Sequence, residues 1–109
     1  MTDKNIKQVK EFLEARGIKT TILAFEETTR TSELAAKAIG CEVAQIAKSL
    51  VFIADEKAAV LVIASGKSRV DTGKLAEKLE ASEVKIADAK TVKEVTGFPI
   101  GGVPPVAHN

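Results

Sequence analysis

Aromatic and sulfur-containing side chains are scarce in this sequence. Its 109 residues include no tryptophan or tyrosine, 4 phenylalanines and a single cysteine, Cys41. So few aromatic rings argue against a dedicated binder of single-stranded nucleic acid, which needs faces on which bases can stack. A single cysteine excludes a disulfide within the chain and favours a reducing compartment, so we expect a cytoplasmic protein.

Net charge and long apolar runs are also lacking. The 16 Lys and Arg against 15 Asp and Glu leave a net charge of +1. The chain therefore has no overall field that would draw in nucleic acid, and any contact with RNA must be local. The N-terminus, MTDKNIKQVKEF, is too polar for a signal peptide, and no apolar run is long enough to span a membrane. The length and composition predict one globular domain over residues 1–109.

Hydrophobic periodicity and turn residues predict a mixed α/β fold. The predicted elements are helices over 3–16, 28–40 and 88–97, a helix beginning at Asp71, a helical turn over 42–47, and strands over 19–25, 49–54, 58–64 and 83–88. The runs 49–54 and 58–64 read as an antiparallel pair. Because both are apolar at nearly every position, we expect both of their faces to be covered. The tail, 98–109, holds all three prolines and fits no regular element.

Two apparent motifs carry little weight. The GKS sequence at 66–68 follows an apolar strand, as the end of a P-loop would, but Leu61 stands where that motif requires glycine. Cys41 and His108 lack the neighbouring ligands that a metal site needs, so we expect no metal. Cys41 then reads as a small apolar filler and His108 as a solvated side chain near the end of the chain.

Two other features each allow two interpretations. The GGVPP segment, 101–105, is either a stiff loop whose Gly101 and Gly102 N–H groups could hold a carbonyl oxygen, or only a rigid turn. Lys48 is either a cation aimed into a pocket, or a charge that complements the end of the preceding helical turn while its methylenes lie along the strand.

Three segments resemble a known family in their order and spacing: IAKSLVFIAD, AAVLVIASGKSRVDTGKLAEKL and TGFPIGGVPPVAHN. They resemble the YbaK and prolyl-tRNA synthetase-associated editing domains over essentially the whole chain. The resemblance implies an α/β (mixed α+β) fold, with a mixed sheet curled toward a barrel and surrounded by helices. It also implies an activity, the hydrolysis of the ester bond in tRNA(Pro) mischarged with cysteine or alanine, without a cofactor.

The resemblance also implies site residues and partners. Lys48 matches a pocket lysine of the family and becomes the catalytic candidate. The substrate-binding candidates are Ser49, the glycine–proline loop with Gly101, Gly102 and Pro105, and Thr31. The implied partners are the acceptor end of a mischarged tRNA and prolyl-tRNA synthetase, with no membrane.

The family usually continues for several dozen residues after this loop. We therefore expect a domain that lacks the family's C-terminal part and exposes a sheet edge, through which copies of the chain could associate. The alternative to an enzyme is a non-catalytic editing-like module that binds a tRNA end or a protein partner.

Overall fold

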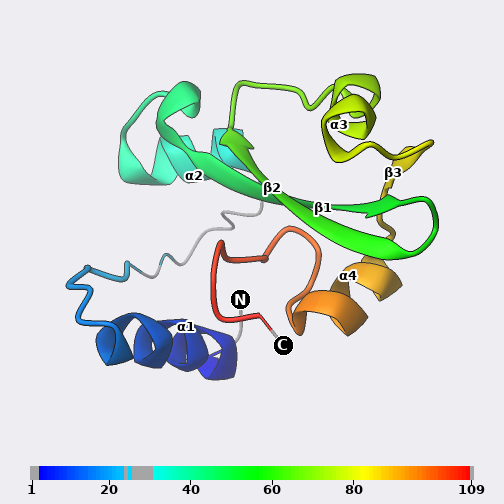
Figure 1. Cartoon of the computed structure of the whole chain (residues 1–109). Helices are drawn as coiled ribbons and strands as arrows, with labels where there is room; N and C mark the ends of the chain where they lie inside the picture. The colour runs from blue at the N-terminus through cyan, green and yellow to red at the C-terminus, as the bar shows by residue number, and fades with distance from the viewer. Residues whose placement is uncertain (1–2, 24, 26–30, 109) are drawn as a thin grey trace.

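A computed structural model describes residues 3–23, 25 and 31–108, and its elements confirm the mixed α+β class (Figure 1). The helices are α1 (Asp3–Ala15), α2 (Ser32–Ile39), α3 (Thr72–Leu79) and α4 (Ala89–Thr96), with a 3₁₀ turn, η1 (Val43–Gln45). The strands are β1 (Ala47–Ala54), β2 (Ala58–Ser65) and β3 (Val84–Ile86). Among the described helices, none is long and apolar enough to cross a membrane.

The three described strands form one antiparallel sheet in the order β2-β1-β3. The predicted pairing of 49–54 with 58–64 is confirmed, with Val51 opposite Leu61 at its centre. β3 pairs with only the last three residues of β1, Phe52–Ala54. The resemblance implied a mixed sheet curled toward a barrel, whereas every described strand pair here is antiparallel.

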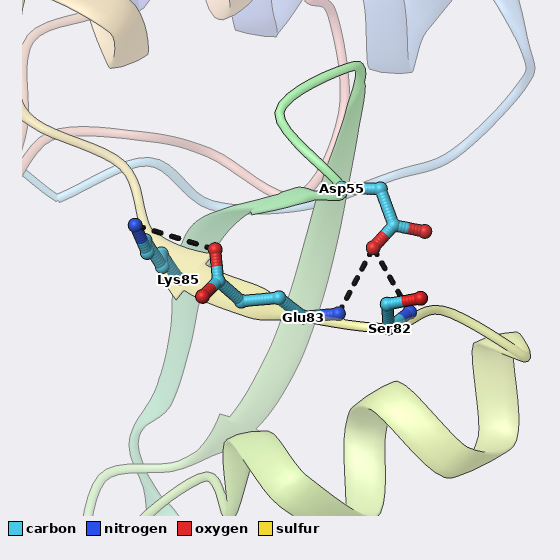
Figure 2. Close-up of polar contacts among 4 residues, drawn as sticks. All are labelled: Asp55, Ser82, Glu83 and Lys85. Atoms are coloured by element: carbon cyan, nitrogen blue, oxygen red, sulfur yellow. Dashed lines mark hydrogen bonds and ion pairs between the residues drawn. The ribbon is translucent and has the colours of Figure 1, made fainter.

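The turn between β1 and β2 has no glycine or asparagine, yet two of its residues adopt positive φ, Asp55 at 49° and Glu56 at 57°. Hydrogen bonds to the side chain of Asp55 help to hold this backbone conformation. The carboxylate accepts hydrogen bonds from the N–H groups of Ser82 and Glu83, each at 2.9 Å (Figure 2). The backbone N–H of Asp55 also donates to the Glu83 carbonyl. The contact ties the hairpin turn to the start of β3, which explains why a polar side chain suffices where glycine is usual.

Each face of the sheet packs against a different part of the chain (Figure 1). On one face, Val51 forms a cluster with Ala87, Val92 of α4 and Val103 of the tail. On the other face, Phe52, Ala54 and Val84 pack against residues of α3 and its flanks, including Leu75. The expectation that both faces of both strands are covered is confirmed in part. Leu61 of β2 packs in the first cluster and Val60 and Val62 in the second, but Ile63 of β2 is 56% exposed.

The helix ends follow the sequence signals. Side chains of Thr31, Asp71 and Asp88 accept hydrogen bonds from the first-turn N–H groups of α2, α3 and α4. Such caps satisfy donors that a helix cannot pair internally. The helix predicted over 28–40 begins at Ser32, and its residues 28–30 lie outside the described residues.

The strand predicted over 19–25 is wrong. Residues 19–23 and 25 have no strand structure, and residue 24 lies outside the described residues. The β-branched side chains there favour an extended backbone, but a strand also needs a neighbour to complete its hydrogen bonds. No described strand pairs with this segment, and Leu23 is 61% exposed.

The tail has no helix or strand over 98–108, as predicted, but it is well anchored. Phe98 is fully buried, and the side-chain amide of Gln8 on α1 donates to the Ala107 carbonyl at 2.8 Å. The expectation of a solvated His108 is wrong. Its half-buried ring lies 6.1 Å from that of Phe98 and hydrogen-bonds the Pro104 carbonyl.

Candidate functional site

A pocket of about 480 Å³ lies along β1, between the start of α2 and the glycine–proline loop. Five of the six site residues predicted from the sequence line it. The full lining is Thr31, Ser32, Ala35, Ile46, Ala47, Lys48, Ser49, Leu50, Val51, Ile86, Ala87, Val92, Ile100, Gly101, Gly102 and Val103. Pro105 is the exception, since it is exposed and lies outside this lining, whereas its neighbour Pro104 is buried.

Lys48 makes two defined contacts. Its Nζ lies 2.6 Å from the carbonyl oxygen of Ser68 and 3.5 Å from that of Gly66, both in the loop that follows β2. These acceptors do not belong to η1, so the Lys48 ammonium does not bond the end of the preceding helical turn. An ammonium has three donors, and two such contacts leave one N–H for another oxygen.

The loop that holds Lys48 is itself packed tightly at Gly66. A Cβ built on Gly66 would lie 2.7 Å from the Ser32 Cβ and 2.7 Å from the Val43 carbonyl oxygen. The Gly66 N–H donates to the Ile46 carbonyl at 2.6 Å. Only glycine fits this close approach, which joins the loop after β2 to the start of α2 and to η1.

Thr31 lines the pocket and is also the N-cap residue of α2. Its Oγ1 accepts a hydrogen bond from the Leu34 N–H at 3.2 Å, so this hydroxyl already has a partner. Ser32 lines the pocket beside it. The sequence did not single out Ser32, because what marks this residue is its close approach to Gly66, and the two residues are distant along the chain.

The two glycines of the loop play different parts. Gly101 adopts φ of +81°, in the region that side-chain-bearing residues rarely enter, and it lines the pocket. The N–H of Gly102 donates to the Pro99 carbonyl at 2.9 Å and closes a turn. This corrects the expectation that both N–H groups are available to a ligand, since the Gly102 donor is already used.

Apolar side chains supply most of the rest of the wall. Val51 and Val92 are buried, and Val103 is half-buried against the same cluster. Ile100, which also lines the pocket, is 43% exposed. The pocket therefore combines polar side chains from β1 and the start of α2 with an apolar wall from β1, α4 and the tail.

Other features of the described residues are less suited to chemistry. A second hollow of about 660 Å³ lies between α1 and residues 17–22 and contains none of the site residues predicted from the sequence. Within the described ranges, no three His, Cys, Asp or Glu side chains gather as metal ligands would. Cys41 is half-buried with a free thiol.

Comparison with known proteins agrees with the resemblance read from the sequence. A proline–tRNA ligase of Lactobacillus helveticus (strain DPC 4571) is 41% identical over 76 residues, which are 70% of this chain and 13% of the ligase. The uncharacterized protein YwhH of Bacillus subtilis (strain 168) is 30% identical over 107 residues, which are 96% of this chain and 68% of YwhH.

A solved structure shows the same similarity. The crystal structure of a candidate trans-editing enzyme for prolyl tRNA synthetase superposes with a TM-score of 0.89 at 41% identity, covering 100% of this chain and 69% of that one. This chain thus spans a small part of the ligase and about two thirds of the other two proteins. The sequence model of the aminoacyl-tRNA editing domain matches residues 26–109, and the chain therefore belongs to the aminoacyl-tRNA editing domain family.

Proposed function

We propose that this chain hydrolyses the ester bond of tRNA(Pro) mischarged with alanine or cysteine. The observation that carries the proposal is the pocket itself, which gathers Lys48 and Ser49 of β1, Thr31 and the Gly101–Gly102 turn around one hollow. The acceptor end of the tRNA would enter this hollow. Prolyl-tRNA synthetase is the proposed protein partner, because a segment of a proline–tRNA ligase is similar to this chain.

The chemistry asks little of the protein. An aminoacyl ester is already activated, so water can attack it once the carbonyl is held and the developing negative charge is stabilised. The remaining N–H of the Lys48 ammonium can donate to that oxyanion, and the Gly101 N–H is a second candidate donor. Collapse of the tetrahedral intermediate breaks the bond to the ribose oxygen, which takes up the proton lost by the attacking water. The tRNA and the amino acid are then free.

Selection among amino acids would come from the apolar wall. Val51, Val92 and Val103 limit the space for a side chain. A small pocket excludes larger side chains by steric clash, whereas filling it with one more methylene gains only about 1–3 kcal/mol. We therefore expect alanine and cysteine to be accepted and bulky residues to be rejected.

One observation favours a second candidate function, a binding module without turnover. The Lys48 ammonium already lies 2.6 Å from the Ser68 carbonyl, so part of its hydrogen-bonding capacity is satisfied without a substrate. In that case the pocket would hold a charged tRNA end and shield the ester rather than cleave it.

A deacylation assay tests the proposal. Ala-tRNA(Pro) and Cys-tRNA(Pro), each labelled in the amino acid, are incubated with the chain, and correctly charged Pro-tRNA(Pro) is the matched control. We expect loss of the alanyl or cysteinyl ester well above the buffer rate, with the prolyl ester spared. Binding of mischarged tRNA without loss of the ester would reject hydrolysis and support the binding module.

A further inference from the structure

One edge of β1 is paired along only part of its length. β1 pairs with β2 over all eight residues, Ala47–Ala54, but with β3 only over Phe52–Ala54. On the side of β1 that faces β3, the residues Ala47–Val51 therefore extend past the end of β3. The pocket lies along this part of β1.

The hydrogen bonds around β1 fix which backbone groups point toward that side. In an antiparallel ladder, successive residues direct their N–H and C=O groups to opposite neighbours. The Val51 carbonyl accepts from the Ala87 N–H at 2.9 Å, so odd-numbered residues of β1 point toward the β3 side. The Ile46 carbonyl accepts from the Gly66 N–H just beyond β2, so even-numbered residues point the other way.

The Ser49 N–H and C=O and the Val51 N–H thus point past the end of β3. Within the described part of the chain, no residue forms a hydrogen bond with these three groups. Residues 46–51 all line the pocket without interruption. Because side chains of a strand alternate between two faces, an unbroken run of lining residues indicates that the backbone edge itself faces the hollow.

We propose that this backbone edge, centred on Ser49, binds the aminoacyl group of the substrate as if it were one residue of an added strand. The inference rests on the proposed function and identifies how that substrate is held. An aminoacyl ester carries the same N–Cα–C=O unit as a residue in a strand. Its ammonium can donate to the Ser49 carbonyl while its ester carbonyl accepts from the Ser49 N–H, which is the two-bond pairing of an antiparallel ladder. The Val51 N–H is a further donor at the same edge.

The register of this pairing also places the amino acid side chain. Residues directly opposite in an antiparallel pair put their side chains on the same face of the sheet. The substrate side chain would then lie on the face of Ser49 and Val51, which is the face covered by Val92 and Val103. The backbone of the amino acid would then be recognised whatever side chain it carries. Val103 would limit the size of that side chain.

Amide hydrogen exchange followed by NMR tests the first part. In the free protein, we expect the amides of Ser49 and Val51 to exchange at least about tenfold faster than those of Leu50 and Phe52, which are paired with β2. The Ile53 amide is the matched control, because it also points toward β3 but is paired there with Lys85. Equal protection of all five amides would overturn the proposal.

A ligand that cannot be hydrolysed tests the second part. The probe is 3′-(L-alanylamino)-3′-deoxyadenosine, whose amide replaces the ester of a charged tRNA end. We expect it to slow exchange at Ser49 and Val51 and to leave Ile53 unchanged. Its analogue without the amino group should bind roughly 10- to 100-fold more weakly, since it loses a charge-assisted hydrogen bond to the Ser49 carbonyl. Ser49→Ala, which keeps the backbone groups, should retain the protection.

The outcomes separate this inference from the proposed function. Protection at Ser49 and Val51 without hydrolysis of Ala-tRNA(Pro) would support the subsite and reject the enzyme. Hydrolysis of Ala-tRNA(Pro) with no change at either amide on probe binding would support the enzyme and overturn the subsite. Failure of the probe to bind at millimolar concentration would also overturn the subsite.

Discussion

The ammonium of Lys48 lies 2.6 Å from the carbonyl oxygen of Ser68, which joins the first residues of β1 to the loop that follows β2. A lysine side chain has many rotamers, and two carbonyl acceptors reduce the number that it can adopt. The loop therefore decides where the charge of Lys48 sits relative to the pocket. This relationship gives separate predictions for the lysine and for the loop.

Replacing Lys48 tests its role directly. We expect Lys48→Ala to slow hydrolysis of mischarged tRNA(Pro) on the order of 10²-fold or more, as loss of a transition-state donor does. The free energy of unfolding should fall by only about 0.5–1.5 kcal/mol, because only hydrogen bonds to carbonyls are lost. Single-turnover deacylation and urea denaturation measure the two effects separately.

Lys48→Arg is the matched variant. A guanidinium keeps the charge and can still donate to the loop carbonyls, but its planar fork does not reproduce a compact ammonium. The free energy of unfolding of Lys48→Arg should be close to that of the parent, whereas its rate of deacylation should stay as low as that of Lys48→Ala. Full activity in Lys48→Ala would remove Lys48 from the catalytic assignment.

Replacing Gly66 tests the loop. A Cβ at this position would lie 2.7 Å from both the Ser32 Cβ and the Val43 carbonyl oxygen, so backbone segments must move apart. We expect Gly66→Ala to lower the free energy of unfolding by about 1–3 kcal/mol, as overpacking does. Because the Gly66 and Ser68 carbonyls move with the loop, activity should fall as well.

Gly73→Ala is the control for this substitution. Gly73 lies in α3, where the nearest atom to an added Cβ is the Asp71 Oδ1 at 3.2 Å. Alanine favours helices over glycine by about 1 kcal/mol, so this variant should be no less stable than the parent. Equal urea midpoints for the two alanine variants would show that the contact at Gly66 is not tight in solution.

The sequence predicts the helices and the β1–β2 hairpin well because their signals are local. Asp71 and Asp88 precede apolar periodic segments, and both cap the helices that follow them. The segment 19–25 shows the limit of such signals, since its β-branched residues predict a strand that has no pairing neighbour among the described residues.

The candidate site was predictable only in part. The resemblance pointed to Lys48, Ser49 and Gly101, and these residues lie around one pocket. Neither the contact of Gly66 with Ser32 nor the partners of the Lys48 ammonium could be read from the sequence, because both join segments that are distant along the chain. The use of the Gly102 N–H in a turn likewise depends on the loop's three-dimensional path.

The Gly101 position can be tested with a control that has the same backbone strain. Gly101 and Gly40 have φ of +81° and +85°, so alanine at either costs about 1–2 kcal/mol. Gly40 has open space around its Cβ position and ends α2, whereas Gly101 lines the pocket. We expect similar losses of stability, with a clear loss of deacylation for Gly101→Ala only. Equal activity of the two variants would reduce the loop to a rigid turn.

The α4 cap predicts a pH dependence of stability. The Thr91 N–H donates to the Asp88 carboxylate at 2.8 Å and holds the pKa of this exposed carboxyl below its ordinary value. A lowered pKa in the folded state means that the stabilisation is complete above the unfolded-state pKa, about 4, and is lost as the pH falls through the folded-state pKa.

Asp88→Asn isolates this contribution, because asparagine caps a helix without titrating. Urea unfolding between pH 2.5 and 6 should show that the parent loses stability relative to Asp88→Asn as the solution becomes acidic. A difference between the two proteins that stays constant over this range would show that the cap does not contribute to the pH dependence.

The exposed edge of β2 predicts self-association. The eight residues of β2 pair with β1 on one side, and no described strand covers the other side. The strand sequence, AAVLVIAS, contains no charged residue or proline that would discourage pairing with another chain, and Ile63 is 56% exposed. We expect a dimer formed by antiparallel pairing of two β2 strands, with a mass that rises with concentration in analytical ultracentrifugation.

Ile63→Lys should shift the equilibrium toward monomer, because it places like charges at the new contact. Ile86→Lys is the control and should have no such effect, since Ile86 is 64% exposed on the opposite edge strand. A single monomeric species at every concentration, or equal effects of the two lysine variants, would show that this edge does not pair.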